Sequence, residues 1–320
     1  GLGDVYKRQD LKSFVLASIT KDDDFLESFA NEYFTRLWHA GRLFFIFDSF
    51  DEISELLDTG QDEEVVDALS RVISRFIGDH PESKGILASR IFRRPTQSFL
   101  AQKVLEIRPL SEASVLHGLS RFASFTRERG VTLFSERRDL VPLVRNPFMM
   151  ALLGDWVKDN AGLPDNQAQI YEGYILKRLK RREQRLHEAG VTIAEFMSLS
   201  TEIAWFVFTI SSYGLEAPVK DISGHFGSKK IDLVISTLRG IRIARVTTGD
   251  EQSFAFVHRR FLEYFVTRRL LENPNEAPIS DIPTDSRGRD ALVLYAQICQ
   301  PDEAERIARL CWDEIKGSFD

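Results

Sequence analysis

The segment LFFIFDSFDEI, residues 43–53, constrains the fold more than any other part of the chain. Its apolar run from Leu43 to Phe47 is too short for a helix and is apolar on both faces, as expected of a central strand in a parallel sheet. The run leads directly into Asp48, Asp51 and Glu52. Such a strand brings carboxylates to the edge of a sheet where ligands bind, and an acidic turn without a special function is the alternative interpretation.

The sequence after this segment predicts more of the same sheet. Residues 65–77 place apolar side chains on one face of a helix, and residues 85–88 and 104–107 are two further short apolar runs. Strand, helix, strand and strand predict a βαβ sheet. Arg90 follows the second run, so we expect it at the same sheet edge as Asp48.

The second half of the chain predicts helices and a small hairpin. Residues 110–158 carry helical spacing without strand signals, and helices are expected again at 168–187 and 192–212. On either side of Thr247–Asp250, apolar residues recur at alternate positions, which predicts a β-hairpin. A hairpin that follows several helices is typical of a winged helix. The fold class predicted is therefore α/β followed by α, with the parallel sheet first.

The composition is that of an ordinary folded protein of about two domains, with 320 residues, 43% of them hydrophobic and 28% charged. The net charge of -6 does not favour a nucleic-acid partner. Cys299 and Cys311 are too few for a disulfide framework and favour a reducing compartment. Because the longest apolar stretch, residues 203–210, is too short to cross a bilayer, we expect a cytoplasmic protein without membrane contact.

The first nine residues, GLGDVYKRQ, resemble the translation of a sequencing adaptor, and the chain does not begin with Met. We expect residues 1–9 to be foreign to the fold. Their glycines do not form a phosphate-binding loop, since no Lys-Ser or Lys-Thr follows them as G-x-x-x-x-G-K-[ST] requires.

Four segments, in order, resemble parts of the NACHT domain of STAND-class P-loop NTPases. LFFIFDSFDEI is similar to its Walker B strand, GILASR (85–90) to its sensor 1 strand, NPFMMALL (146–153) to its Asn-Pro-Leu segment, and FAFVHRRFLEYFVTRRLL (254–271) to its winged-helix signature. The resemblance covers about residues 11–272. Ser49 and Ala88 stand where the family usually has Gly and Thr, and neither change removes a phosphate or metal ligand.

The resemblance implies that the predicted sheet is a partial P-loop-type parallel sheet, and it divides the chain into five parts. They are a non-native leader (1–9), a partial NACHT α/β nucleotide-binding core (10–108), a helical subdomain (109–165), a winged-helix domain (166–272), and a linker with the start of a C-terminal helical sensor or repeat region (273–320).

The resemblance also implies ATP or ADP with Mg²⁺ as cofactors. Asp48 would bind Mg²⁺, and Asp51 or Glu52 would position the hydrolytic water as the catalytic carboxylate. Arg90 would contact the γ-phosphate, for which a planar and permanently charged group is suited. An ordinary surface ion pair is the alternative for Arg90.

Two cofactor-binding residues are implied in the later segments. Pro147 would pack on the adenine, and His258 would reach the β-phosphate of ADP and hold the domains in a closed, inactive arrangement. Without the family, Pro147 is a helix-start proline and His258 a structural histidine.

The family's Walker A loop would lie upstream of residue 1. We therefore expect an N-terminally truncated chain that binds ATP weakly or not at all, although the full-length protein would be an ATP hydrolase. The implied function is a signal-transduction switch that oligomerises when a downstream region senses a ligand, in bacterial antiviral defence. A non-hydrolysing interaction scaffold is the alternative.

A basic run leaves a further alternative open. Six cationic residues fall on one predicted helix: Lys177, Arg178, Lys180, Arg181, Arg182 and Arg185. A solvated or interdomain face is the simpler interpretation, and a patch for nucleic acid or an acidic partner is the other. The helix KKIDLVISTL (229–238) offers few side chains for reading bases, which weakens a DNA-binding winged helix.

Overall fold

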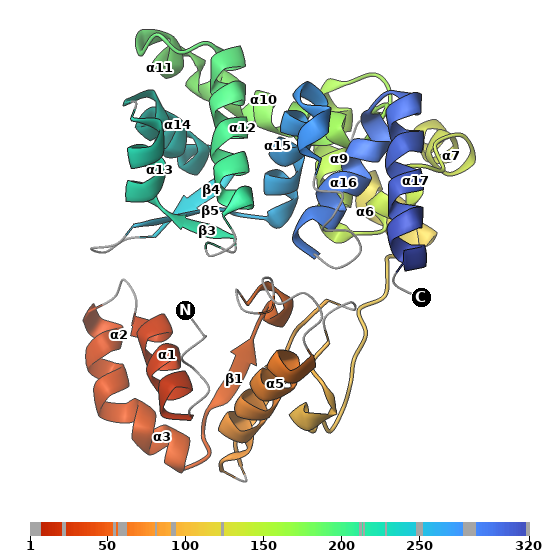
Figure 1. Ribbon diagram of the computed structural model, residues 1–320. Helices are drawn as coiled ribbons and strands as arrows, with labels where there is room; N and C mark the ends of the chain where they lie inside the picture. The colour runs from red at the N-terminus through yellow and green to blue at the C-terminus, as the bar shows by residue number, and fades with distance from the viewer. Residues whose placement is uncertain are drawn as a thin grey trace.

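The computed structural model describes residues 8–20, 24–53, 56, 63–80, 82–90, 94–122, 125–210, 213, 215–227, 229–247, 252–277 and 286–317. Within these residues the chain is mostly helical, with one two-stranded parallel sheet and one three-stranded antiparallel sheet. Two apolar cores define an N-terminal lobe (residues 8–108) and a C-terminal lobe (residues 109–317). Residues 100–111 connect them without regular structure (Figure 1).

The N-terminal lobe is built from short helices around the parallel sheet. Its elements are α1 (Arg8–Thr20), α2 (Asp24–Phe29), the π-helical η2 (Ala30–Phe34), α3 (Thr35–His39), β1 (Phe44–Phe47), the 3₁₀ turn η3 (Phe50–Glu52), α5 (Glu63–Gly78), β2 (Lys84–Leu87) and η5 (Gln97–Phe99). Two residues of the expected leader, Arg8 and Gln9, belong to α1, and residues 1–7 lie outside the described part.

The strand pair β1 and β2 is parallel and in register from Phe44 opposite Lys84 to Phe47 opposite Leu87. Phe45 is buried against Phe76 of α5, with ring centroids 4.9 Å apart. The expectation that β1 is buried on both faces is wrong, because Ile46, on the other face, is 73% exposed. The described helices cover one face of this sheet, and a strand buried on both faces needs cover on both.

The prediction of a third strand at residues 104–107 is also wrong. This segment has no regular structure, and Val104 and Ile107 are 78% and 96% exposed. An apolar run becomes a strand only when a neighbour pairs with its backbone, and the described sheet consists of β1 and β2 alone.

The C-terminal lobe contains the remaining elements. They are α6 (Glu112–Ser120), α7 (Arg127–Ser135), α8 (Val141–Val144), α9 (Pro147–Asp159), α10 (Gln167–Leu179), η6 (Lys180–Arg182), α11 (Glu183–Glu188), α12 (Ile193–Thr209), β3 (Glu216–Pro218), α13 (Val219–Phe226), α14 (Lys229–Gly240), β4 (Ala244–Val246), β5 (Ser253–Phe256), α15 (Arg259–Glu272), η8 (Pro274–Glu276), α16 (Ser286–Ile298) and α17 (Pro301–Gly317). One continuous core runs through this lobe from Val115 to Ile307.

The antiparallel sheet has the order β3-β5-β4. The predicted hairpin is confirmed, with Ala244 of β4 opposite Phe256 of β5, while residues 248–251 of its turn lie outside the described part. The sequence did not indicate β3, because a three-residue strand that ends in Pro218 has no periodicity to detect.

Helix α15 forms the centre of the C-terminal lobe, where it packs against α12 and α16. Phe261, Phe265 and Leu270 are almost completely buried. The hydroxyl of Thr267 donates to the carbonyl oxygen of Ala291 at 3.1 Å and so joins α15 to α16. Helix α16 begins at Ser286, within the stretch 273–320 in which we expected a linker followed by the start of a C-terminal helical region.

No single helix of the described ranges is both long and apolar enough to cross a bilayer. Taken together, Gln167–Glu188 and Ile193–Thr209 meet the length and composition criteria, with a bend of 102° between them.

Candidate functional site

The carboxyl end of β1 points toward the C-terminal lobe (Figure 1). Asp48 follows the strand and is exposed, and its Oδ1 accepts the backbone N–H of Ser49 at 2.9 Å. Ser49 has φ 58° and ψ 46°, in the left-handed region that non-glycine residues seldom adopt. This conformation turns the chain into η3, which brings Asp51 back toward the end of β2.

Asp51 and Arg90 meet at this edge. The backbone N–H of Arg90 donates to Asp51 Oδ1 at 3.0 Å, and Arg90 Nε lies 3.4 Å from Asp51 Oδ2. The Asp51 side chain is 2% exposed and that of Arg90 is 33% exposed. Glu52 closes the same turn, and its side chain lies outside the described part. A buried carboxylate here fixes a partly exposed guanidinium at the lobe boundary.

Arg90 also reaches the C-terminal lobe. Its Nη1 lies 3.9 Å from Oδ2 of Asp290 on α16, and Arg260 Nη1 of α15 lies 3.7 Å from the same oxygen. Two arginines from different lobes therefore converge on one carboxylate oxygen. Asp290 was not predicted as a site residue, because no local sequence pattern indicates that the first turns of α16 approach the end of β2.

The start of α15 also contains a buried ion pair. Arg259 Nε lies 2.9 Å from Glu263 Oε1, and both side chains are almost fully buried. Arg260 Nη1 lies 3.5 Å from Glu263 Oε2. Burial raises the pKa of Glu263, and the nearby arginines oppose this effect. Although burial alone would lower the pKa of Arg260, Glu263 and Asp290 raise it.

His258 lies beside these arginines as the N-cap of α15. Its Nδ1 accepts the backbone N–H of Arg260 at 3.1 Å. Burial, with the charges of Arg260 and Arg90, lowers the pKa of His258 to about 4. The ring is therefore neutral at pH 7, and because Nδ1 accepts, the proton is on Nε2, which is an N–H donor.

Pro147 is exposed as the first residue of α9, where Asn146 Oδ1 accepts the N–H groups of Phe148 and Met149. The adjacent ring of Phe148 stacks on His258, with centroids 4.2 Å apart and planes 3° apart. The structure thus brings the neighbour of Pro147 directly against His258. Phe148 was not predicted as a site residue, since in the sequence an aromatic residue after Asn-Pro cannot be distinguished from a core residue.

These residues fit a phosphate-bearing ligand better than a metal held by protein alone. Arg90, Arg260 and His258 supply N–H donors of the kind that bind phosphate oxygens. Within the described ranges, no group of three His, Cys, Asp or Glu side chains has the spacing of a metal site. The exposed carboxylate of Asp48 suits Mg²⁺ only in the manner of nucleotide sites, where phosphates and water supply the other ligands.

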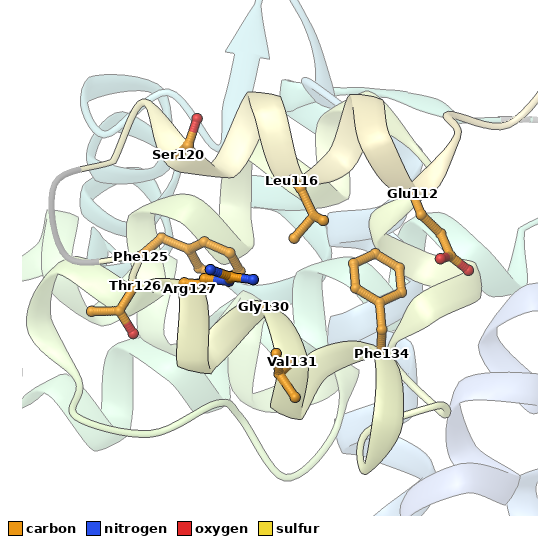
Figure 2. Close-up of a pocket in the computed structure, with 9 residues that line it drawn as sticks. All are labelled: Glu112, Leu116, Ser120, Phe125, Thr126, Arg127, Gly130, Val131 and Phe134. Carbon is orange, nitrogen blue, oxygen red and sulfur yellow. The ribbon is translucent and has the colours of Figure 1, made fainter.

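An open cavity of about 460 Å³ lies elsewhere, between α6 and α7. Leu116 of α6 and Phe134 of α7 point into it, with Glu112 and Arg127 at its margin (Figure 2). None of the residues predicted for a site lines this cavity.

The basic run is partly engaged within the protein. Lys177 Nζ lies 3.0 Å from Asp155 Oδ1 and 2.8 Å from Asp159 Oδ2, and the Arg178 guanidinium lies over the Tyr174 ring at 4.1 Å. On α14, Lys230 pairs with Glu195 at 2.6 Å. The contacts of Lys177 with Asp155 and Asp159 favour the interdomain interpretation for that residue, whereas Lys180, Arg181, Arg182 and Arg185 are exposed, as a solvated face would be.

Neither a protein-family model nor a curated protein matches the chain.

Proposed function

We propose that the chain is part of a NACHT-type STAND NTPase, in which ADP or ATP with Mg²⁺ binds at the boundary between the two lobes and controls their arrangement. The observation that carries this proposal is the position of Arg90. It contacts Asp51 at the sheet edge and Asp290 of the other lobe, and its charge acts on His258. Three segments that resemble separate nucleotide motifs therefore meet at one boundary.

Each site residue has a part in this proposal. Asp48 would hold Mg²⁺, which would neutralise phosphate charge, and Asp51 or Glu52 would orient the attacking water. Of these two carboxylates, Glu52 suits the water better, because Asp51 is already held by Arg90.

The phosphates and the base would be bound by groups of both lobes. Arg90 would donate to the γ-phosphate and the Nε2–H of His258 to the β-phosphate. Pro147 would cover the adenine with a rigid apolar ring that offers no competing hydrogen bond.

The same proposal includes a P-loop-type sheet in the N-terminal lobe and a winged helix in the C-terminal lobe. The parallel adjacency of β1 and β2 supports a P-loop-type sheet, and the order α12, β3, α13, α14, β4, β5 supports a winged helix. The proposed setting is a cytoplasmic signalling protein in bacterial antiviral defence, which self-associates when activated.

Such a switch requires that nucleotide bind two arrangements of the lobes with different affinity. A nearly complete shift from one arrangement to the other requires binding free energies for the two arrangements that differ by about 5.5 kcal/mol. In the described arrangement Arg90 bridges the lobes, which is what a closed, inactive state requires.

The test begins with the gene. DNA upstream of the codon for residue 10 is expected to encode a G-x-x-x-x-G-K-[ST] loop, and the longer chain that carries it is expected to bind ADP. The same chain should bind ATP, and Arg90→Gln should weaken the binding of ATP about tenfold because the γ-phosphate loses a donor, whereas the same change at exposed Arg94 should not. A longer chain without the loop, or one that carries the loop and binds no nucleotide, would contradict the proposal.

A further inference from the structure

The two arginines at the lobe boundary already have an anionic partner within the chain. Arg90 Nη1 and Arg260 Nη1 lie 3.9 Å and 3.7 Å from the same oxygen, Asp290 Oδ2. The three side chains are partly exposed, at 33%, 37% and 20%. A carboxylate between two guanidinium groups, reachable from solvent, occupies the position that a phosphate oxygen would take.

Asp290 is held in this place by the packing of α16. The next residue, Ala291, is 1% exposed, and its carbonyl oxygen accepts the hydroxyl of Thr267 on α15 at 3.1 Å. The position of the carboxylate therefore depends on the position of α16.

From this geometry we infer that Asp290 is an internal substitute for an anionic ligand, which occupies an Arg90–Arg260 phosphate site and latches α16 to the sheet edge until a phosphate group displaces it. The inference rests on the proposed function and adds to it a second phosphate-binding arginine and an autoinhibitory contact. Arg260 becomes a ligand-binding residue, whereas Asp290 competes with the ligand.

The latch makes phosphate binding and α16 release reciprocal. An anion that takes the two arginines weakens the hold on α16, and any partner that draws α16 away raises the affinity for the anion by the same factor. The segment formed by α16 and α17 thereby gains a direct electrostatic connection to the sheet edge.

The test measures binding of pyrophosphate, ADP and inorganic phosphate to the 320-residue chain by calorimetry at low salt. Asp290→Asn should bind pyrophosphate about fivefold more tightly than the wild type, because the carboxylate that competes for both arginines is removed. Asp290→Glu should restore the wild-type affinity for pyrophosphate. The double variant Asp290→Asn/Arg260→Gln should not show the increase in affinity that Asp290→Asn shows alone. Asp313→Asn, an equal charge change at an exposed position of α17, is the matched control and should behave as the wild type.

Hydrogen exchange of residues 286–298 supplies the second readout. Exchange should be faster in Asp290→Asn without any ligand, and pyrophosphate should accelerate it in the wild type. A general loosening of the fold would lower anion affinity rather than raise it, so an unchanged or weaker affinity in Asp290→Asn overturns the inference. If Asp290→Asn binds pyrophosphate more tightly than the wild type does, but ADP binds no more tightly than pyrophosphate, the latch is supported and the proposed nucleotide ligand is contradicted.

Discussion

Asp51 and Arg90, which are 39 positions apart in the chain, are joined by two contacts: the Arg90 backbone N–H donates to Asp51 Oδ1 at 3.0 Å, and Arg90 Nε lies 3.4 Å from Asp51 Oδ2. The carboxylate is buried and the guanidinium is partly exposed. The pair links the loop after β1 to the loop after β2 and directs Nη1 of the guanidinium toward Asp290 of the C-terminal lobe.

Arg90→Gln should lower the free energy of unfolding of the N-terminal lobe by about 2 kcal/mol, because a buried carboxylate loses its cationic partner while it keeps the backbone N–H. Urea denaturation followed by circular dichroism measures the change. Arg94→Gln, at an exposed position nearby, should leave stability unchanged. Equal stability of the two variants would show that the ion pair contributes nothing.

The stability of the C-terminal lobe should depend on His258 between pH 6.5 and pH 4. The pKa of His258 is lowered from 6.5 to about 4 in the folded state, so in this window the unfolded chain binds more protons. The free energy of unfolding should therefore fall as the pH falls from 6.5 to 4. We expect a loss of about 2 kcal/mol, less than the full shift implies because the ring is partly exposed to solvent.

His258→Asn isolates this effect. Asparagine keeps an acceptor at the N-cap of α15 and removes the titrating group. Urea midpoints measured at pH 7 and pH 5 should differ less in this variant than in the wild type. His117→Asn, at an exposed position of α6, is the control, and a pH dependence that His258→Asn leaves unchanged would contradict the assignment.

Gly154→Ala should destabilise the C-terminal lobe by about 1–3 kcal/mol, because an added Cβ would overlap the Phe122 ring that packs on α9. Gly78→Ala, at the end of α5, meets no atom within 4 Å and should stabilise the chain by about 0.5–1 kcal/mol. Thermal unfolding of both variants distinguishes the two effects. A shift of the same sign in both would contradict the packing described for α9.

Arg129 holds the end of α9 through three carbonyl oxygens. Its guanidinium donates to Val157 O at 3.0 Å, Asn160 O at 3.0 Å and Ala161 O at 2.6 Å. Arg129→Met should lower the free energy of unfolding by about 2 kcal/mol, since these acceptors lose charged donors. Arg127→Met, at an exposed position of α7, should cost far less, and equal losses in chemical denaturation would contradict the capping role.

Local patterns predict those elements whose partners are close in the chain. The hairpin of β4 and β5 and the helix α5 follow from periodicities that a short window contains. Residues 104–107 have the composition of a strand, but pairing depends on a neighbour that periodicity does not reveal, and the segment is exposed. The apolar residues on both faces of β1 likewise did not predict its burial, because burial depends on neighbouring elements that periodicity does not reveal.

In the candidate site, too, some contacts can be predicted from the sequence and others cannot. The proximity of Asp51 and Arg90 follows from a general rule, because parallel strands end at the same edge of a sheet. The contacts of Asp290 with two arginines and of Phe148 with His258 depend on how α16 and α9 pack, and no short-range signal in the sequence encodes that packing.

Photoaffinity labelling with 8-azido-ADP and Mg²⁺ tests the central claim most directly, because a covalent adduct records even weak binding by the 320-residue chain. Peptide mapping is expected to place the adduct within residues 146–149 or 256–260, with competition by unlabelled ADP. An adduct that ADP does not compete, or one confined to other parts of the chain, would contradict a nucleotide site at the lobe boundary.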